Sequence, residues 1–290
     1  MIYVYASGTH NTVPTNELPD LKSELKALSG KVYRRIDHFI QLALIGAHKA
    51  VAEYALPSKT AIYMTSGQGN IAVFQRVREQ RHVHKLLPKP VDFINLLSNS
   101  AGFYVASHLG LEGKNLFLSH HRFPVQMSLL TALNDLRLKK QEAVLVGGVD
   151  EWIENQELAK KLLGVDEATE LGEGSNWMLI GAEAEGAIAA FEMEPKLLDF
   201  PALRERLCKE AAGTRLAFSS RCGDTEAEAC LALVEGSTRY DYESGCGYYE
   251  TLPLYALNRF LEEERGRMLH IDVSDGRYMV MGVDNGAYAK

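Results

Sequence analysis

The chain lacks long apolar runs and an excess of positive charge, and each absence excludes a class of protein. No apolar stretch approaches the roughly 20 residues that a membrane-spanning helix requires. The formal net charge of -7 argues against nucleic acid as a partner, because phosphate binding needs a cationic surface. The first five residues lack the charged start of a secretory signal, so we expect no membrane partner and a cytoplasmic location.

Cysteine is also scarce, and its spacing excludes the usual zinc sites. The four cysteines show neither a C-x-x-C spacing nor nearby histidines at zinc-site spacing; they are Cys208, Cys222, Cys230 and Cys246. Reduced and mostly buried thiols are the expected state of such residues inside cells. We therefore predict no disulfide framework, no metal and no cofactor.

Histidine pairs occur twice, and we interpret both as structural. His120 and His121 are adjacent, so their side chains point to opposite faces of a strand or turn and do not readily share one metal. His82 and His84 have a closer ligand spacing, but they lie in the basic run 76–85 with no third ligand nearby. A solvated helix end is the expected structure there.

What the sequence does contain is typical of a globular α/β protein. Its 290 residues are 46% hydrophobic and 24% charged, which supports a full core in one large domain or two ordinary ones. Residues 36–51 repeat apolar side chains at helical spacing, whereas 115–119 and 142–148 are continuously apolar, as in strands covered on both faces. Asp92 can cap a helix that runs to about His108. Strands and helices alternate again after Gly174, with strands expected at 215–219, 268–273 and 277–283 among others. We predict two similar halves, 1–168 and 169–290, packed as one unit.

The segment 113–150 has the most informative layout. Gly113 and Asn115 open a short apolar strand, a helix is expected from Pro124 to Leu138, and the second strand ends in Gly147-Gly148. This layout resembles the nucleophile segment of β-ketoacyl synthases. The resemblance implies a layered thiolase-like fold (αβαβα) and places Arg122 at the position of the family's catalytic cysteine. A guanidinium stays protonated and cannot replace the thiolate that holds the acyl chain. At that position its donors would fill the vacated pocket by pairing with a carboxylate or with backbone carbonyls.

The two histidines of the ketosynthase pattern are missing as well. The first of these regions reads Ser219-Ser220-Arg221-Cys222-Gly223, with Ser220 near the expected histidine, and the second reads Ser244-Gly245-Cys246-Gly247, with Cys246 near it. Losing one member of a catalytic unit already removes most of the rate. The resemblance therefore implies that the chain has no condensing activity by itself.

Further motifs keep the family's order along the chain. They are Arg35–Ala43, Thr65–Gly69, Leu171–Leu179, Cys222–Glu226 and Leu269–Asp272. Among ketosynthase relatives without the cysteine, the chain most resembles a chain length factor, the inactive half of a ketosynthase heterodimer. Its compactness suggests the aryl polyene type within polyketide and fatty-acid-like biosynthesis.

This resemblance implies specific partners and interface residues. The partner would be an active ketosynthase subunit, and acyl carrier protein would be reached through that complex, since the net negative charge fits poorly with an acidic carrier. Phe123, Pro124 and Gln126 are the expected interface and tunnel residues. Phe93 and Phe103 are the expected tunnel walls, because a bulky side chain that closes an apolar tunnel determines where elongation stops.

Three alternatives stay open on the sequence. The chain could be a stand-alone acyltransferase or thioesterase whose nucleophile has moved to Cys246 or Ser219, although no base stands beside Cys246 in the sequence. It could be a scaffold without tunnel contact. Finally, a shifted alignment would make Arg122 an ordinary surface residue.

Overall fold

The computed structural model describes residues 1–13 and 17–288 and consists of two α/β halves with the same strand order. The strands of the first half are β1 (Ile2–Gly8), β3 (Ala61–Thr65), β4 (Asn115–Leu118), β5 (Ala143–Asp150) and β6 (Glu173–Gly181). Those of the second half are β7 (Ala189–Met193), β8 (Arg215–Phe218), β9 (Thr238–Arg239), β10 (Arg267–Ser274) and β11 (Arg277–Asp284). A short strand, β2 (Asn11–Thr12), pairs with β6.

The internal repeat is visible in the strand pairing. From the junction outward the first half runs β1-β6-β5-β3-β4 and the second runs β7-β11-β10-β8-β9. In each half the two outer pairings are parallel and the two inner ones antiparallel. β1 and β7 pair antiparallel and join the halves. Because β6 pairs within the first half, the repeats meet between Gly181 and Ala189, after the boundary predicted at residues 168 and 169.

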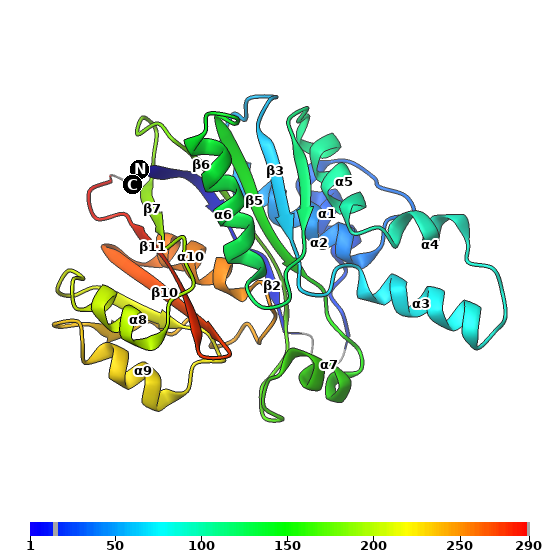
Figure 1. The fold of residues 1–290 in the computed structure, drawn as a ribbon. Coiled ribbons are helices and arrows are strands. Elements are labelled where there is room, and N and C mark those ends of the chain that lie inside the picture. Colours follow the sequence, from blue (N-terminus) through cyan, green and yellow to red (C-terminus); the bar gives the residue numbers. More distant parts are fainter. Residues whose placement is uncertain (14–16, 289–290) are drawn as a thin grey trace.

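Helices form three layers around these strands. The first outer layer contains α1 (Leu21–Ser29), α2 (His38–Val51) and α5 (Asn99–Leu109), behind the first half in Figure 1. The second outer layer contains α8 (Phe200–Leu207) and α9 (Asp224–Leu231) on the second half. α6 (Pro124–Arg137) and α10 (Leu252–Glu263) occupy the layer between the halves. This is the layered α/β arrangement expected from the sequence.

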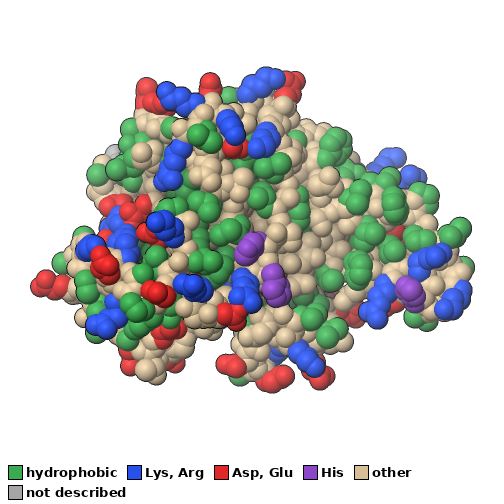
Figure 2. Space-filling view, in the orientation of Figure 1, with side chains coloured by type: hydrophobic (Ala, Val, Ile, Leu, Met, Phe, Trp, Pro, Cys, Tyr) green, Lys and Arg blue, Asp and Glu red, His purple; other side chains and the backbone are tan. Residues whose placement is uncertain are grey.

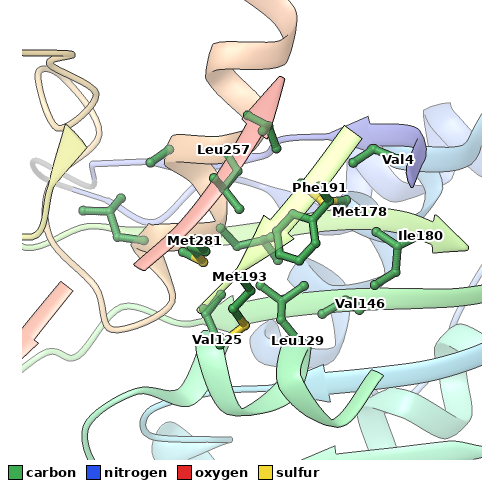
Figure 3. Packing of buried hydrophobic residues seen from close by; sticks show 14 of the residues in the cluster. Val4, Val125, Leu129, Val146, Met178, Ile180, Phe191, Met193, Leu257 and Met281 are labelled. Atoms are coloured by element: carbon green, nitrogen blue, oxygen red, sulfur yellow. The ribbon is translucent and has the colours of Figure 1, made fainter. Parts of the chain in front are cut away.

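The central layer is apolar because its helices meet strands of both halves. Val125 and Leu129 of α6 lie beside Phe191 and Met193 of β7 in Figure 3, and all four are buried. Full burial of one such side chain stabilises the fold by about 1.5–3 kcal/mol. Packing of this kind fixes where α6 begins, and hence where the loop before it lies.

Three helices extend from this body. α3 (Ile71–His82) and α4 (Pro90–Asn95) form an arm at the right of Figure 1, and α7 (Gln156–Leu163) lies below the sheet. One helix was expected from about residue 92 to 108, but the structure breaks it into α4 and α5. The break follows Asn95, whose side-chain amide donates a hydrogen bond to the carbonyl oxygen of Arg35 outside the helix (3.0 Å). Within the described residues no helix is long and apolar enough to cross a membrane.

Candidate functional site

The candidate site is a cleft at one end of the sheet. The loops that follow β4, β5, β8 and β10 lie at this end. A cavity of about 700 Å³ opens there, and His121, Arg122, Ser220, Arg221, Glu250 and Asp275 are among its lining residues. Carboxyl ends of parallel strands meet at one edge of a sheet, which brings together residues far apart in sequence. The segment 113–150, which resembles the ketosynthase nucleophile segment, therefore contributes His121 and Arg122 to this cleft.

The interior of this cleft holds an ion pair. Asp272, on β10, is fully buried, and both of its carboxylate oxygens accept hydrogen bonds from the guanidinium of Arg221 (3.1 and 3.2 Å). Burial tends to lower the pKa of Arg221, but the Asp272 carboxylate more than offsets this and the pKa is raised. Arg221 therefore stays charged, and Asp272 is its ion-pair partner.

Gln126 and the loop before α6 complete this arrangement. The buried amide of Gln126 donates to Asp272 Oδ2 (2.9 Å), and Arg221 also donates to the carbonyl oxygen of Arg122 (2.9 Å). The start of α6 is thus bonded to β10 of the other half through charged groups. We refer to Arg221, Asp272 and Gln126 as the plug; Arg221 lines the cavity, and Asp272 and Gln126 are buried behind it.

Arg122 does not enter the interior, contrary to our expectation that it fills a vacated pocket. Its side chain is 47% exposed and forms an ion pair with Asp275 at the rim. Asp275 has a φ of 48° and stands with Gly276 in the two-residue turn between β10 and β11, where such left-handed residues are favoured. The cation inside the cleft is Arg221, which lies 99 residues later in the chain.

Neither residue near the two expected histidine positions is hydrogen-bonded to a histidine in the described part of the chain. Ser220 is exposed and donates to the carboxylate of Glu243 (2.5 Å). Cys246 is buried, its sulfur contacts only backbone carbonyl oxygens, and burial raises its pKa to about 12. The other alternative nucleophile, Ser219, is buried as well, and its hydroxyl has no hydrogen-bond partner among the described residues. Neither hydroxyl nor thiol is activated by a histidine.

The histidines of the region have structural positions. Nδ1 of His120 accepts from the backbone N–H groups of Arg122 and Phe123 (3.3 and 3.2 Å), which orders the loop before α6. His270 is buried beside the Tyr242 hydroxyl (2.9 Å), and burial lowers its pKa to about 4. In residues 1–13 and 17–288 no group of three or more histidine, cysteine or acidic side chains is placed to hold a metal ion.

Two carboxylates beside the cleft have raised pKa values. Burial, followed by the charge of Asp150, raises the pKa of Glu250 to about 7. Asp150 is fully buried and accepts from the Ser66 hydroxyl and from the backbone N–H groups of Gly67 and Thr251 (2.7, 2.8 and 2.8 Å), yet burial raises its pKa. These hydrogen bonds hold the loops after β3 and before α10 together.

The predicted interface residues divide into two groups. Phe123, Pro124 and Gln126 are buried inside this subunit's own core, so they offer no exposed face to a partner. Phe93 on α4 and Phe103 on α5 are 61% and 65% exposed and lie on the surface away from the cleft cavity. Only these two are available to another chain.

The sequence interpretation missed Arg221 and Asp272 as site residues. Asp272 lies in the apolar stretch Leu269–Val273, and Arg221 follows the apolar strand β8 by three residues. A charged residue in a buried strand requires a partner, because an unpaired buried charge is strongly unfavourable. That signal was present, but it did not identify which arginine forms the pair.

Comparison with known proteins finds this architecture among solved structures. No protein-family model and no curated protein matches the chain. Among solved structures, "The ishigamide ketosynthase/chain length factor" superposes with a TM-score of 0.76 at 16% identity, covering 98% of this chain and 99% of that one. A type II PKS acyl-carrier protein in complex with its ketosynthase gives 0.66 at 12% identity and covers 98% and 99%.

A third similar structure is 3-oxoacyl-(acyl carrier protein) synthase III, FabH, from Pseudomonas aeruginosa PAO1. Its TM-score is 0.55 at 15% identity, and the match covers 98% of each chain. At such identities the likeness concerns the backbone arrangement. The chain has the thiolase-like fold of the ketosynthases.

Proposed function

We propose that this chain is a non-catalytic chain length factor that pairs with an active β-ketoacyl synthase and shapes its acyl tunnel. The plug carries this proposal. Condensation needs a thiolate and two histidines in the cleft, whereas here the cavity is lined by Arg221, which forms an ion pair with the buried Asp272. No cysteine lines the cavity in the part of the chain that the structure describes.

The surface supports a protein partner. Large apolar side chains stand more than half exposed along α3, α4, α5 and their connections; they are Phe74, Val83, Leu86, Leu87, Phe93, Ile94, Leu97 and Phe103. Figure 2 shows hydrophobic side chains gathered over this side of the molecule. We call these residues the apolar arm surface. Contiguous apolar surface of this kind marks protein interfaces in soluble proteins.

A free strand edge lies next to the apolar arm surface. Among the described strands, β4 pairs with β3 alone, so its other edge has no strand beside it. Leu116, Phe117 and Leu118 are only half-buried. An unpaired edge with apolar side chains is a template for pairing with another chain. Pairing there would place the partner against α4 and α5, where Phe93 and Phe103 stand.

The known structures support the same partners. One is a ketosynthase/chain length factor, and another contains an acyl-carrier protein bound to its ketosynthase. By analogy we propose an active ketosynthase as the partner and acyl carrier protein as the substrate donor of the complex. We assign the chain to polyketide or fatty-acid-like biosynthesis, with the aryl polyene type as the specific proposal.

The test is an acyl-transfer measurement on the isolated chain. After incubation with an acyl-carrier-protein thioester, intact-mass analysis should show no acyl adduct, while the same chain co-purifies with a ketosynthase and restores its condensation. Arg122→Cys should also form no condensation product, because neither region in which the ketosynthase pattern has a catalytic histidine contains one. An adduct on the unmodified chain would instead favour the stand-alone acyltransferase or thioesterase with a relocated nucleophile.

A further inference from the structure

A second cavity, remote from the plug, lies between α1 and the segment 30–37 that leads into α2. Its volume is about 310 Å³. Five of its lining residues are cationic, namely Lys22, Lys26, Lys31, Arg34 and Arg35. Leu25, Val32 and Ile36 supply an apolar part of the wall. No acidic residue lines this cavity, which is unusual on a chain whose net charge is -7.

The five cations are not neutralised by neighbouring acids. None of them forms an ion pair with any side chain in residues 1–13 and 17–288. The nearby acids are bound elsewhere: Asp20 caps α1 through Ser23, Glu24 pairs with Lys49 (2.8 Å), and Asp37 pairs with Arg76 (2.7 Å). Like charges held close together repel, so this arrangement favours an anionic ligand.

The cationic segment is held in one conformation. Asn95 donates to the carbonyl oxygen of Arg35 (3.0 Å), and Gln41 donates to that of Ile36 (3.2 Å). Arg35 itself has a φ of 61°, a left-handed conformation that is unfavourable for a residue with a side chain. Such conformations persist where the surroundings impose them, and they occur at binding sites. These contacts fix the backbone at residues 35 and 36, which line the cavity.

The neighbouring His108 responds to the same positive charge. Its Nδ1 is hydrogen-bonded to the Tyr33 hydroxyl (2.5 Å), and Lys31 donates to its carbonyl oxygen (3.3 Å). Burial, then the charges of Lys31 and of His48, lower the pKa of His108 to about 4. Because Tyr33 lines the cavity, a bound anion would act on this imidazole at short range.

We propose that this cavity binds a small organic phosphate, with the phosphate on the lysine and arginine groups and an apolar body against Leu25, Val32 and Ile36. Guanidinium and ammonium groups bind phosphate through charge-assisted hydrogen bonds. Ligand cavities begin at about 300 Å³, so this one suits a single small molecule and not a protein helix. The assignment does not depend on the proposed chain length factor role.

The experiment uses calorimetric titration of the full chain with phenyl phosphate, inorganic phosphate and phenol. Phenyl phosphate should bind at a single site, inorganic phosphate more weakly, and phenol not measurably. The double variant Lys26→Gln/Arg34→Gln should weaken phenyl phosphate binding by about tenfold or more, and added salt should weaken binding to the wild type. Lys59→Gln removes an exposed cation outside the cavity and should leave binding unchanged.

Three results would overturn the assignment: no saturable binding of phenyl phosphate, equal losses in the double variant and in Lys59→Gln, or an acyl carrier protein that binds through these residues while phenyl phosphate does not. If the double variant does not fold, Lys22→Gln/Lys26→Gln serves instead, because both side chains are exposed on α1.

Bound phenyl phosphate should also raise the pKa of His108, observable by NMR of its imidazole. An unchanged imidazole titration would place the ligand elsewhere.

Discussion

Arg221 and Asp272 form an ion pair at the base of the cleft, with the guanidinium 3.1 Å from Oδ1 and the carboxylate fully buried. The pair connects the loop after β8 to β10, and Gln126 extends it to α6. An ion pair, and not packing alone, therefore connects these elements.

Removal of one member of this pair should be costly. Asp272→Ala leaves the guanidinium of Arg221 buried without its counterion, and we expect a loss of about 3–5 kcal/mol in the free energy of unfolding, measured by urea denaturation. The double variant Arg221→Met/Asp272→Ala should lose less than the sum of the single variants. Arg122→Ala is the control, because its pair with Asp275 is half-exposed and contributes at most about 1 kcal/mol. Additive losses would contradict direct coupling of Arg221 and Asp272.

Cys246 should resist alkylation in the folded protein. Its thiol is buried and its pKa is raised to about 12, so at neutral pH almost none of it is the reactive thiolate. Cys208 is exposed and serves as the internal control. Peptide mapping after brief treatment with iodoacetamide should show modification of Cys208 but not of Cys246. Equal labelling of the two would reopen Cys246 as a candidate nucleophile.

Stability should fall as pH rises through the range in which Glu250 ionises. The pKa of Glu250 is raised from 4.5 to about 7, so between these values the folded state binds more protons than the unfolded state. Its stabilising contribution is complete below about pH 4.5 and is lost as pH rises through about 7. Glu250→Gln should reduce this slope and raise the free energy of unfolding at pH 8 by about 1–3 kcal/mol.

The matched control for this pH dependence is Glu185→Gln, which changes an exposed glutamate in the loop before β7. It should leave the slope unchanged. Glu151, whose pKa burial also raises to about 7, should maintain part of the slope in the Glu250→Gln protein. A slope identical in wild type and Glu250→Gln would show that Glu250 ionises normally.

Charge placed on the apolar arm surface should weaken the complex with the ketosynthase. Leu97 lies between α4 and α5 and is 53% exposed, so Leu97→Arg should not disturb the core but should place a charge in the interface. We expect affinity to fall by about tenfold or more in a titration of the two subunits. Leu197→Arg, at an exposed leucine near α8, should bind normally. Equal affinities for both variants would place the interface elsewhere.

Phe103→Ala should lengthen the product of the complex. If this ring closes the partner's acyl tunnel, its removal opens apolar space, and each added methylene that is buried gains about 0.8 kcal/mol. Phe93→Ala should act in the same direction. Phe74→Ala, on α3 of the same surface, controls for general loss of partner binding. Mass spectrometry of the products decides: unchanged length with intact pairing would remove the gating role.

Most secondary structure could be predicted from local patterns, and the failures have physical causes. β5, β8, β10 and β11 occur where apolar runs or alternation predicted strands, because burial on both faces demands such residues. The helix break after Asn95 was missed; the side chain of Asn95 bonds there to Arg35, 60 residues away, a contact that no local pattern reveals. The boundary between the halves was missed because β6 pairs with β1 and β5, which precede it in the sequence and belong to the first half. No local signal reveals such a pairing.

The sequence alone determined the chemical inventory of this protein: no cysteine stands at the expected nucleophile position and no histidine at the two expected histidine positions, and the resemblance to ketosynthases implied a thiolase-like fold. Only the tertiary structure decided that Arg221, not Arg122, pairs with the buried Asp272, and that Phe93 and Phe103 face outward. The reason is that a residue's type and local periodicity are written along the chain, whereas the counterion of a buried charge is chosen by the packing of strands that lie far apart in sequence.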